Sequence, residues 1–470
     1  MKRITDVLSR KAFACVALLT LCFIAAAHPG SVGEKAVSAD AFVNSMGVNV
    51  HLHFADTSYG NFAAVEKALK DLGVRHIRDG LVDTQWTPYY DRLNELGRSG
   101  IKAILITSPK ESAAVLAAYP QHVVDSFEAY EGPNEYDLSG DKDWSGTLNA
   151  FVSVLYQAVN DGSSVAAGAS RTSRSAPPAT GNPPKTPSAS ATAAPPKAPA
   201  GLQVATSGSR TAKYPVVAPS LTQPASFPKV AGTGQFADFA NLHNYFGGRN
   251  PGTPGWGANG YGSYAWNLNL AASAWPGKPV FTTETGYFND VATLTGVPEV
   301  VSGKYMPRLF FEQWMHGIQR TYVYELVDLH AGGAGSNSYG LLHSDFTPKP
   351  AFTAVRGLIG LLADPGPSFV PGNLDFTLSG DLTDVHHLLL QRRNGTFFLA
   401  IWIEQLGYDV NARKELAVAD RSLVVKTTTS LKMKAHRLGL DGSIQSSDLG
   451  AGLAHTVSIG DRVVILEISQ

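Results

Sequence analysis

Two kinds of apolar pattern alternate along the chain from Ser45 to Ala363. Short apolar runs, typical of buried strands, are followed by longer segments in which apolar residues recur every three or four positions, as on one face of a helix. This order predicts an α/β fold, a (β/α)8 TIM barrel with an outer ring of helices. The predicted strands are Met46–His51, Val74–Arg78, Ile101–Ile106, Phe127–Glu131, Tyr214–Pro219, Phe239–His243, Pro279–Thr283 and Tyr322–Val327.

The pattern changes after the helix predicted at Ala351–Ala363. From Asp364 onward, apolar and polar residues alternate in short segments that are separated by turn signals such as Asn394-Gly395 and Asp441-Gly442. Period-two alternation with Asn-Gly and Asp-Gly turns is typical of antiparallel strands. We therefore expect a catalytic barrel at residues 40–364 and a C-terminal all-β sandwich domain at residues 365–470.

A low-complexity segment, residues 162–213, interrupts the barrel pattern between the fourth predicted helix and the fifth strand. It has no aromatic and no acidic residue and is rich in Ala, Pro, Ser and Thr. Such a composition buries too little apolar surface to offset the chain entropy lost on folding. We interpret it as a disordered insertion in one loop, because the remaining strands of the barrel follow it.

The first 39 residues read as a signal peptide and a short leader. Basic residues precede an apolar run of 16 residues, Ala12–Ala27, and small residues suited to cleavage follow at Ala27 and again at Ala39. The run is shorter than the ~20 residues of a membrane-spanning helix. The sequence thus predicts an exported protein, periplasmic or extracellular, whose mature form is not in the membrane. Both cysteines, Cys15 and Cys22, lie in the signal, so no disulfide is expected.

The net charge of −1 gives no sign of a nucleic acid or an anionic membrane as partner, so we expect neither, and it favours a neutral or small-molecule ligand. The sequence also lacks a Gly-x-Gly-x-x-Gly fingerprint, a phosphate-binding loop and a Gly-x-Ser-x-Gly elbow. Nucleotide cofactors and serine hydrolysis are therefore excluded, and we expect no cofactor.

Carboxylates stand where two of the predicted strands end. Glu131-Gly132-Pro133-Asn134-Glu135 follows the fourth strand, and Glu284 follows the seventh. The active sites of TIM barrels lie at the carboxyl ends of the strands. Cleavage of a sugar acetal needs one protonated carboxyl group and one ionised carboxylate on opposite sides of the bond. The pair therefore predicts a glycosidase with a carbohydrate substrate.

In these motifs the chain resembles glycoside hydrolase clan A, over roughly residues 45–363 without the insertion. The resemblance implies a retaining double displacement in which Glu135 is the acid/base, Glu284 is the nucleophile and Asn134 holds the sugar 2-hydroxyl. Families 39 and 5 are both near, and the motifs do not separate them.

The resemblance extends to three further residues. Arg78, at the end of the second strand, matches an arginine that keeps the nucleophile ionised. His243 and Tyr245 match a His-x-Tyr at the sixth strand, whose tyrosine hydroxyl reaches the nucleophile. The alternative is that the glutamates merely pair with arginines at the strand ends.

Several other candidates have two interpretations. Glu131 is the rival of Glu135 for the acid, but its place inside the strand indicates a structural carboxylate. Glu325 and Asp328, near the eighth strand, either bind sugar hydroxyls or satisfy loop backbone. The tryptophan that often ends this strand in the family is absent. Trp256, together with Trp266 and Trp144, is a candidate platform for a sugar ring or else packs a surface loop.

His51-Leu52-His53 resembles the start of a metal-dependent amidohydrolase site. Such a site needs a histidine on the fifth strand, which reads Tyr214-Pro215-Val216-Val217-Ala218-Pro219, so we expect no metal. His51 and His53 are expected to contact substrate or to close the barrel mouth. Two alternatives to a glycosidase remain: a carbohydrate-binding barrel without turnover, and this amidohydrolase.

Overall fold

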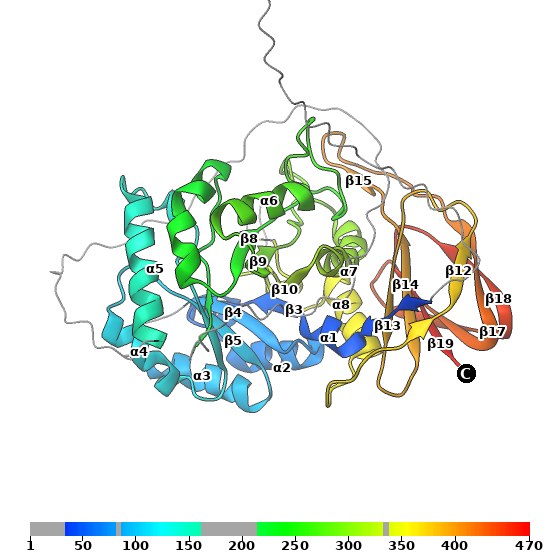
Figure 1. Ribbon diagram of the computed structural model, residues 1–470, viewed down its shortest axis with the longest axis horizontal. Coiled ribbons are helices and arrows are strands. Elements are labelled where there is room, and N and C mark those ends of the chain that lie inside the picture. Colours follow the sequence, from blue (N-terminus) through cyan, green and yellow to red (C-terminus); the bar gives the residue numbers. More distant parts are fainter. Residues whose placement is uncertain (1–32, 81–85, 161–213, 332–337) are drawn as a thin grey trace, which may run out of the picture.

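The computed structural model describes residues 33–80, 86–160, 214–331 and 338–470. Most of the predicted signal peptide and the low-complexity insertion lie outside the described residues. Two parts make up the described chain, an α/β barrel and a β-domain that packs beside it (Figure 1). Within the described ranges, no helix combines the length and the apolar character needed to cross a membrane.

The barrel is a sheet of parallel strands, as predicted. In the described part of the chain the strand order is β7-β6-β5-β4-β3-β10-β9-β8, and a parallel bridge between Val217 and Phe239 joins the two edges. The strands are β3 (Met46–Asn49), β4 (His76–Gly80), β5 (Lys102–Ile106), β6 (Phe127–Glu131), β7 (Val216–Val217), β8 (Ala240–His243), β9 (Val280–Thr285) and β10 (Ile318–Val323).

Helices surround this sheet and bury one face against it. In α2 (Phe62–Leu72) the residues Val65, Leu69 and Leu72 form the buried stripe. The Asn61 side chain caps its start, and Gly73 ends it in a left-handed conformation that favours glycine. The other α-helices are α1 (Ala39–Asn44), α3 (Thr87–Arg98), α4 (Ala113–His122), α5 (Trp144–Asn160), α6 (Tyr264–Ala274), α7 (Glu299–Met315) and α8 (Pro350–Leu362). The segment η3 (Pro224–Phe236) is a 3-10 helix.

The eighth strand begins and ends four residues earlier than the apolar pattern predicts. We expected Tyr322–Val327, whereas β10 covers Ile318–Val323. The start of the strand is polar because Arg320 lies in the sheet and pairs with Glu128 of β6 at 2.9 Å. A partly buried ion pair interrupts the apolar run, so the sequence pattern hides this part of the strand.

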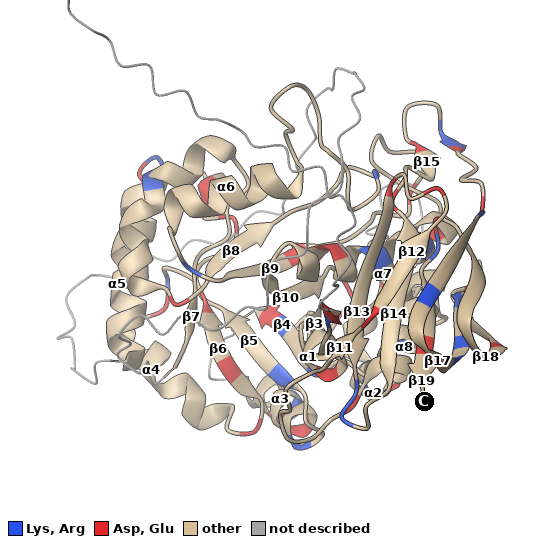
Figure 2. Ribbon diagram, turned by 45° about the vertical axis from the view of Figure 1, so that its right-hand side comes forward, with Lys and Arg blue, Asp and Glu red and all other residues tan. Residues whose placement is uncertain are grey.

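The C-terminal part is an antiparallel β-sandwich, in agreement with the alternating pattern. Its strands pair in the order β12-β17-β19-β14-β13, with β18 added to β17 (Figure 2). The long hairpin of β17 and β18 shifts register after Lys426, and beyond this shift β17 pairs with β19 instead of β12. The strands are β12 (Phe376–Ser379), β13 (Val385–Gln391), β14 (Phe397–Ile403), β17 (Arg421–Leu438), β18 (Ile444–Ile459) and β19 (Val464–Ser469).

The residues just before the barrel belong to the second domain. Their two short strands are β1 (Glu34–Lys35), which pairs with β11 (Asn373–Leu374), and β2 (Val37–Ser38), which pairs with β13. The sequence pattern places them in the predicted leader, which extends to the possible cleavage site after Ala39. Their strand conformation comes from tertiary pairing, and Ser38 also caps α1.

Helix α7 joins the two domains through a buried contact. The Arg308 guanidinium pairs with Glu404 at 2.7 Å, and the Glu404 carboxylate also accepts a hydrogen bond from the Trp402 indole. The ring of Trp402 stacks on Phe311 with a centroid distance of 5.3 Å. Because these groups are buried, the second domain is packed against the barrel over a specific interface.

Candidate active site

Arg78 connects the polar side chains at the carboxyl ends of the strands. It lies on β4 and only 2 % of its side chain is exposed. Its guanidinium donates to both oxygens of Glu131 at 2.6 and 2.8 Å, to Glu284 at 2.6 Å, to Asn134 at 2.7 Å and to Asn49 at 2.9 Å. A planar fork of donors thus fixes side chains from several strands in one geometry.

Glu131 lies at the floor of this group and is fully buried. Besides the two bonds from Arg78, its Oε1 accepts from Asn241 Nδ2 at 3.0 Å and from the Thr283 hydroxyl at 3.1 Å. A buried carboxylate with this many donors is locked in place and has no access to a ligand. Its surroundings are those of a structural group.

Glu284, on β9, is the less exposed of the two candidate catalytic glutamates. One oxygen accepts from Arg78, and the other accepts from the Tyr245 hydroxyl at 3.0 Å. Burial acts to raise the pKa of Glu284, but the charges of His243 and Arg78 and the hydrogen bonds from Arg78 and Tyr245 bring it below the usual value. Glu284 is therefore ionised at neutral pH. Burial raises the pKa of Tyr245, so this phenol stays a donor.

Glu135 follows β6 in a left-handed conformation, with φ of 44°. Its backbone N–H donates to Ser220 Oγ at 3.0 Å, which anchors the loop. Its carboxylate lies 2.8 Å from Nδ1 of the buried His243, whose Nε2 is 3.0 Å from Thr283 Oγ1. The Glu135 side chain is 30 % exposed, against 13 % for Glu284.

The two glutamates face each other. One oxygen of Glu135, one of Glu284 and a ring nitrogen of His243 all lie within 4.8 Å of one another. Three such groups could hold a cation, but both oxygens of Glu284 already accept hydrogen bonds, one of them from a guanidinium. This positive neighbour opposes a divalent ion, and the arrangement suits a pair of reacting carboxyl groups better.

A cavity of about 310 Å³ opens above these groups and is lined by residues of β3, β4, β5 and β9 and of the segments that follow β3, β6 and β10. His53 lies 3.2 Å from Asp79, and His51 lies 3.4 Å from the buried Glu325. Burial lowers the pKa of His51 to about 4 and raises that of Glu325 well above its usual value. Both histidines therefore line the pocket beside carboxyl groups.

Asp328 lies apart from this cavity. Its carboxylate pairs with Lys349 at 2.8 Å, and its Oδ1 accepts from the backbone N–H of Gly340 at 2.8 Å. The structure thus places it in the role of a loop anchor. Trp144 packs at the start of α5, where Lys229 lies over its ring.

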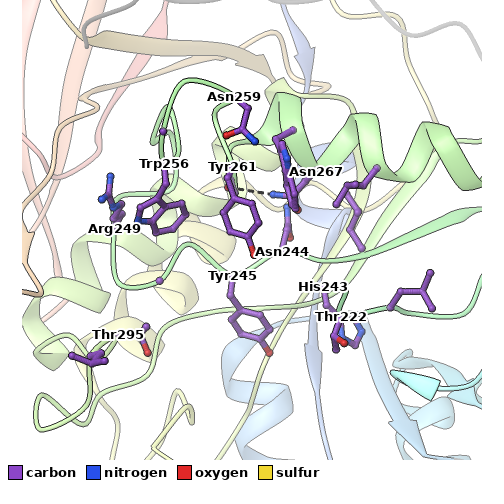
Figure 3. Close-up of a pocket in the computed structure, with 18 of the residues that line it drawn as sticks. Thr222, His243, Asn244, Tyr245, Arg249, Trp256, Asn259, Tyr261, Asn267 and Thr295 are labelled. Atoms are coloured by element: carbon purple, nitrogen blue, oxygen red, sulfur yellow. Dashed lines mark hydrogen bonds between the residues drawn. The ribbon is translucent and has the colours of Figure 1, made fainter. Parts of the chain in front are cut away.

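Trp256 lines a second and larger cavity of about 720 Å³ (Figure 3). His243 and Tyr245, which contact the two glutamates, also line it, and so does Trp266. The predicted residues thus fall into three groups: a catalytic-type cluster, a pocket above it, and an aromatic cavity beside it.

Sequence reasoning missed several residues of the cluster. Asn49 and Asp79 stand at or near the ends of strands, so a search for polar residues at these ends could have found them. Asn241, Thr283 and Ser220 carry no such signal. They bond to the glutamates, to Asn134 and to one another, and only the closed barrel brings them together.

Comparisons with known proteins rest on structure alone, since no protein-family model and no curated protein matches the sequence. A family 39 glycoside hydrolase from the gut symbiont Bacteroides cellulosilyticus WH2 superposes with a TM-score of 0.57 at 13% identity, over 92% of this chain and 82% of that one. The chain has the fold of family 39 glycoside hydrolases.

Two β-xylosidase structures from Caulobacter crescentus show the same likeness. One, described as monomeric, has a TM-score of 0.55 at 14% identity and covers 93% of this chain and 97% of that one. The other, named as a family 39 enzyme, has a TM-score of 0.52 at 13% identity over 93% and 98%. Of the two families that the sequence left open, the structural likeness is to family 39, with both the barrel and the β-sandwich.

Proposed function

We propose that the protein is a retaining glycoside hydrolase that acts by double displacement. The observation that carries the proposal is the short separation of the two glutamates, with one oxygen of each within 4.8 Å. Retaining enzymes hold their carboxyl groups about 5–5.5 Å apart, whereas inverting enzymes leave roughly 6.5–9.5 Å for a water molecule. The spacing fits direct attack by one carboxylate.

In the first step Glu284 attacks the anomeric carbon while Glu135 gives its proton to the glycosidic oxygen, and the bond between that carbon and oxygen breaks. In the second step Glu135 takes a proton from water, the hydroxide attacks the anomeric carbon, and Glu284 leaves as a carboxylate. The contacts support this division of roles: Glu284 is held ionised by Arg78 and Tyr245, and Glu135 is the more exposed of the pair.

The neighbours of the pair have supporting roles in this proposal. His243 orients Glu135 through the 2.8 Å contact. Asn134 has its Oδ1 occupied by Arg78 and Ser220, which leaves its Nδ2 as the donor for a sugar hydroxyl. His51 and His53 offer ring nitrogens to the same sugar.

We further propose that the glycone, the sugar whose anomeric carbon is attacked, is neutral and β-linked. Arg78 is the only Lys or Arg among the described residues of the 310 Å³ cavity, and its donors are engaged with protein oxygens. A uronate would therefore meet the carboxyl groups of Glu135, Glu284 and Asp79 without a free cation. The β-xylosidase structures noted above are compatible with a neutral sugar.

Export is the remaining part of the proposal. The basic residues and the apolar run Ala12–Ala27 support a cleaved signal peptide, and the enzyme would then act in the periplasm or outside the cell.

A panel of 4-nitrophenyl β-glycosides, with xyloside, glucoside and galactoside, tests the function. We expect turnover of at least one of them, and proton NMR of the first-formed sugar should show the β-anomer. Absence of turnover across the panel and on oligosaccharides would overturn the proposal, and an α-anomer would overturn the retaining mechanism.

A further inference from the structure

The 720 Å³ cavity, which we name the aromatic trench, adjoins the catalytic pair through His243 and Tyr245, which line it and contact the two glutamates. Its walls come from the end of β8 and the loop that follows it, from α6, from the segment after β7 into η3, from the loop after β9, and from a hairpin of the second domain. Residue Thr222 of the β7 loop donates its N–H to Asp137, two residues beyond Glu135. The trench thus runs beside the segment that carries the proposed acid.

Aromatic rings of the β8 loop form one wall (Figure 3). Tyr261 is 46% exposed, and its ring lies 4.4 Å from Trp266 and 6.1 Å from Trp256 between centroids. An exposed aromatic ring that is held by two other rings offers a rigid apolar face. A pyranose presents its C–H bonds to such a face.

The loop is built to hold these rings. Trp256 lies against Gly247 and Gly262, where a methyl group would overlap its indole, and both glycines have the positive φ that favours glycine. The Arg249 guanidinium stacks over Trp256 at 4.5 Å. The aromatic wall is therefore preorganised before any ligand binds.

The second domain completes the trench. Val410 and Asn411, in the hairpin of β15 (Tyr408–Asp409) and β16 (Lys414–Glu415), line it. In the same domain, Glu404 accepts hydrogen bonds from Asn250 Nδ2 at 2.7 Å and from the Gly252 N–H at 2.8 Å. The β-sandwich thus supplies part of the wall and holds the loop that carries the rest.

We propose that the aromatic trench binds the leaving-group part of the substrate, and that this part is a neutral saccharide stacked on Tyr261. The inference rests on the proposed function, because the acid protonates the oxygen that joins glycone and leaving group. The small polar cavity then holds the glycone, and the trench holds what lies beyond the bond. Among the described residues that line the trench there is no carboxylate, and Arg249 is the only lysine or arginine.

The test uses the full chain and a glycosyl-enzyme trapped with 2,4-dinitrophenyl 2-deoxy-2-fluoro-β-xyloside or the corresponding glucoside. Xylobiose or cellobiose in the trench should release the enzyme by transfer: the sugar hydroxyl attacks the anomeric carbon, Glu135 takes its proton, and the ester bond to Glu284 breaks. In Tyr261→Ala we expect the ratio of saccharide-driven to azide-driven release to fall about 10-fold or more, because the apolar face is lost.

The matched controls separate stacking from folding. Tyr261→Phe should keep the wild-type ratio, and so should Trp144→Ala, which removes an aromatic ring that lines neither of the two cavities described above. Failure of the fluoroxyloside, the fluoroglucoside and the corresponding fluorogalactoside to label the enzyme, together with no turnover across the aryl glycoside panel, would refute the proposed function itself. If the enzyme is labelled but no saccharide accelerates its release, only the proposal for the trench is overturned. The same holds if Tyr261→Ala leaves the ratio of saccharide-driven to azide-driven release unchanged. Acceleration by a uronate disaccharide alone would overturn its neutral specificity.

Discussion

The hydrogen bond from Tyr245 to Glu284 gives the sharpest test of how the proposed nucleophile is kept ionised. Tyr245→Phe removes one oxygen and leaves the ring in place. The bond is 3.0 Å long, its acceptor is a carboxylate, and the donor is buried. Hydrogen bonds to charged groups contribute about 1.5–3 kcal/mol, which corresponds to a loss of about 10- to 150-fold in kcat/KM if the bond is retained up to the transition state.

The same substitution should change the pH dependence. Glu284 must be ionised to attack, so activity is lost as the pH falls through its pKa. Because the Tyr245 hydroxyl is one of the groups that lower the pKa of Glu284, its removal should raise that pKa. The acidic limb of the kcat/KM profile should therefore move to higher pH.

Steady-state kinetics on the best aryl glycoside, from acidic to neutral pH, measures both effects. Tyr264→Phe is the matched control, because the Tyr264 hydroxyl is also buried but has no hydrogen-bond partner among the described residues. The control should keep wild-type kinetics. The reasoning fails if Tyr245→Phe is within twofold of wild type and its acidic limb does not move.

Four further predictions follow from the same geometry. Glu284→Ala should lose turnover and regain it with azide to give an inverted azide product, whereas Glu135→Ala should react with dinitrophenyl glycosides, stall, and give a retained product with azide; equal inactivity of both without azide rescue would contradict the roles. Glu131→Gln should lower the free energy of unfolding in urea by about 3–5 kcal/mol, as expected when a buried ion pair is broken, and an unchanged midpoint would disprove its structural role. The exported protein should begin after Ala27, since cleavage at the alternative site after Ala39 would remove β1 and β2; N-terminal sequencing decides this. Replacing the low-complexity insertion by a short linker should leave the melting temperature and turnover nearly unchanged, and loss of the folded barrel would show that the segment packs.

Local patterns of apolar and polar residues predict much of the architecture. The strands β5 and β6 coincide closely with the predicted ones, and in β5 the buried residues leave a continuous apolar signal, whereas β4 is polar in sequence and lies two residues beyond its predicted place. Glu135 and Glu284 could be singled out for the same reason, since each follows such a run. Where a strand contains a partly buried ion pair, as β10 does at Arg320, the pattern misplaces the strand.

The sequence by itself determined the order of strands and helices, the second β-domain and the residues that stand at the strand ends, because these depend on periodicities within a few residues. Only the tertiary structure decided which of these residues meet. Arg78 is 53 residues from Glu131 and 206 from Glu284, yet it contacts both, since closure of the barrel brings the strand ends into one ring. The pairing of β1 and β2 with the far end of the chain, and the hairpin of the second domain beside Trp256, likewise depend on contacts between distant segments, which a local pattern does not encode.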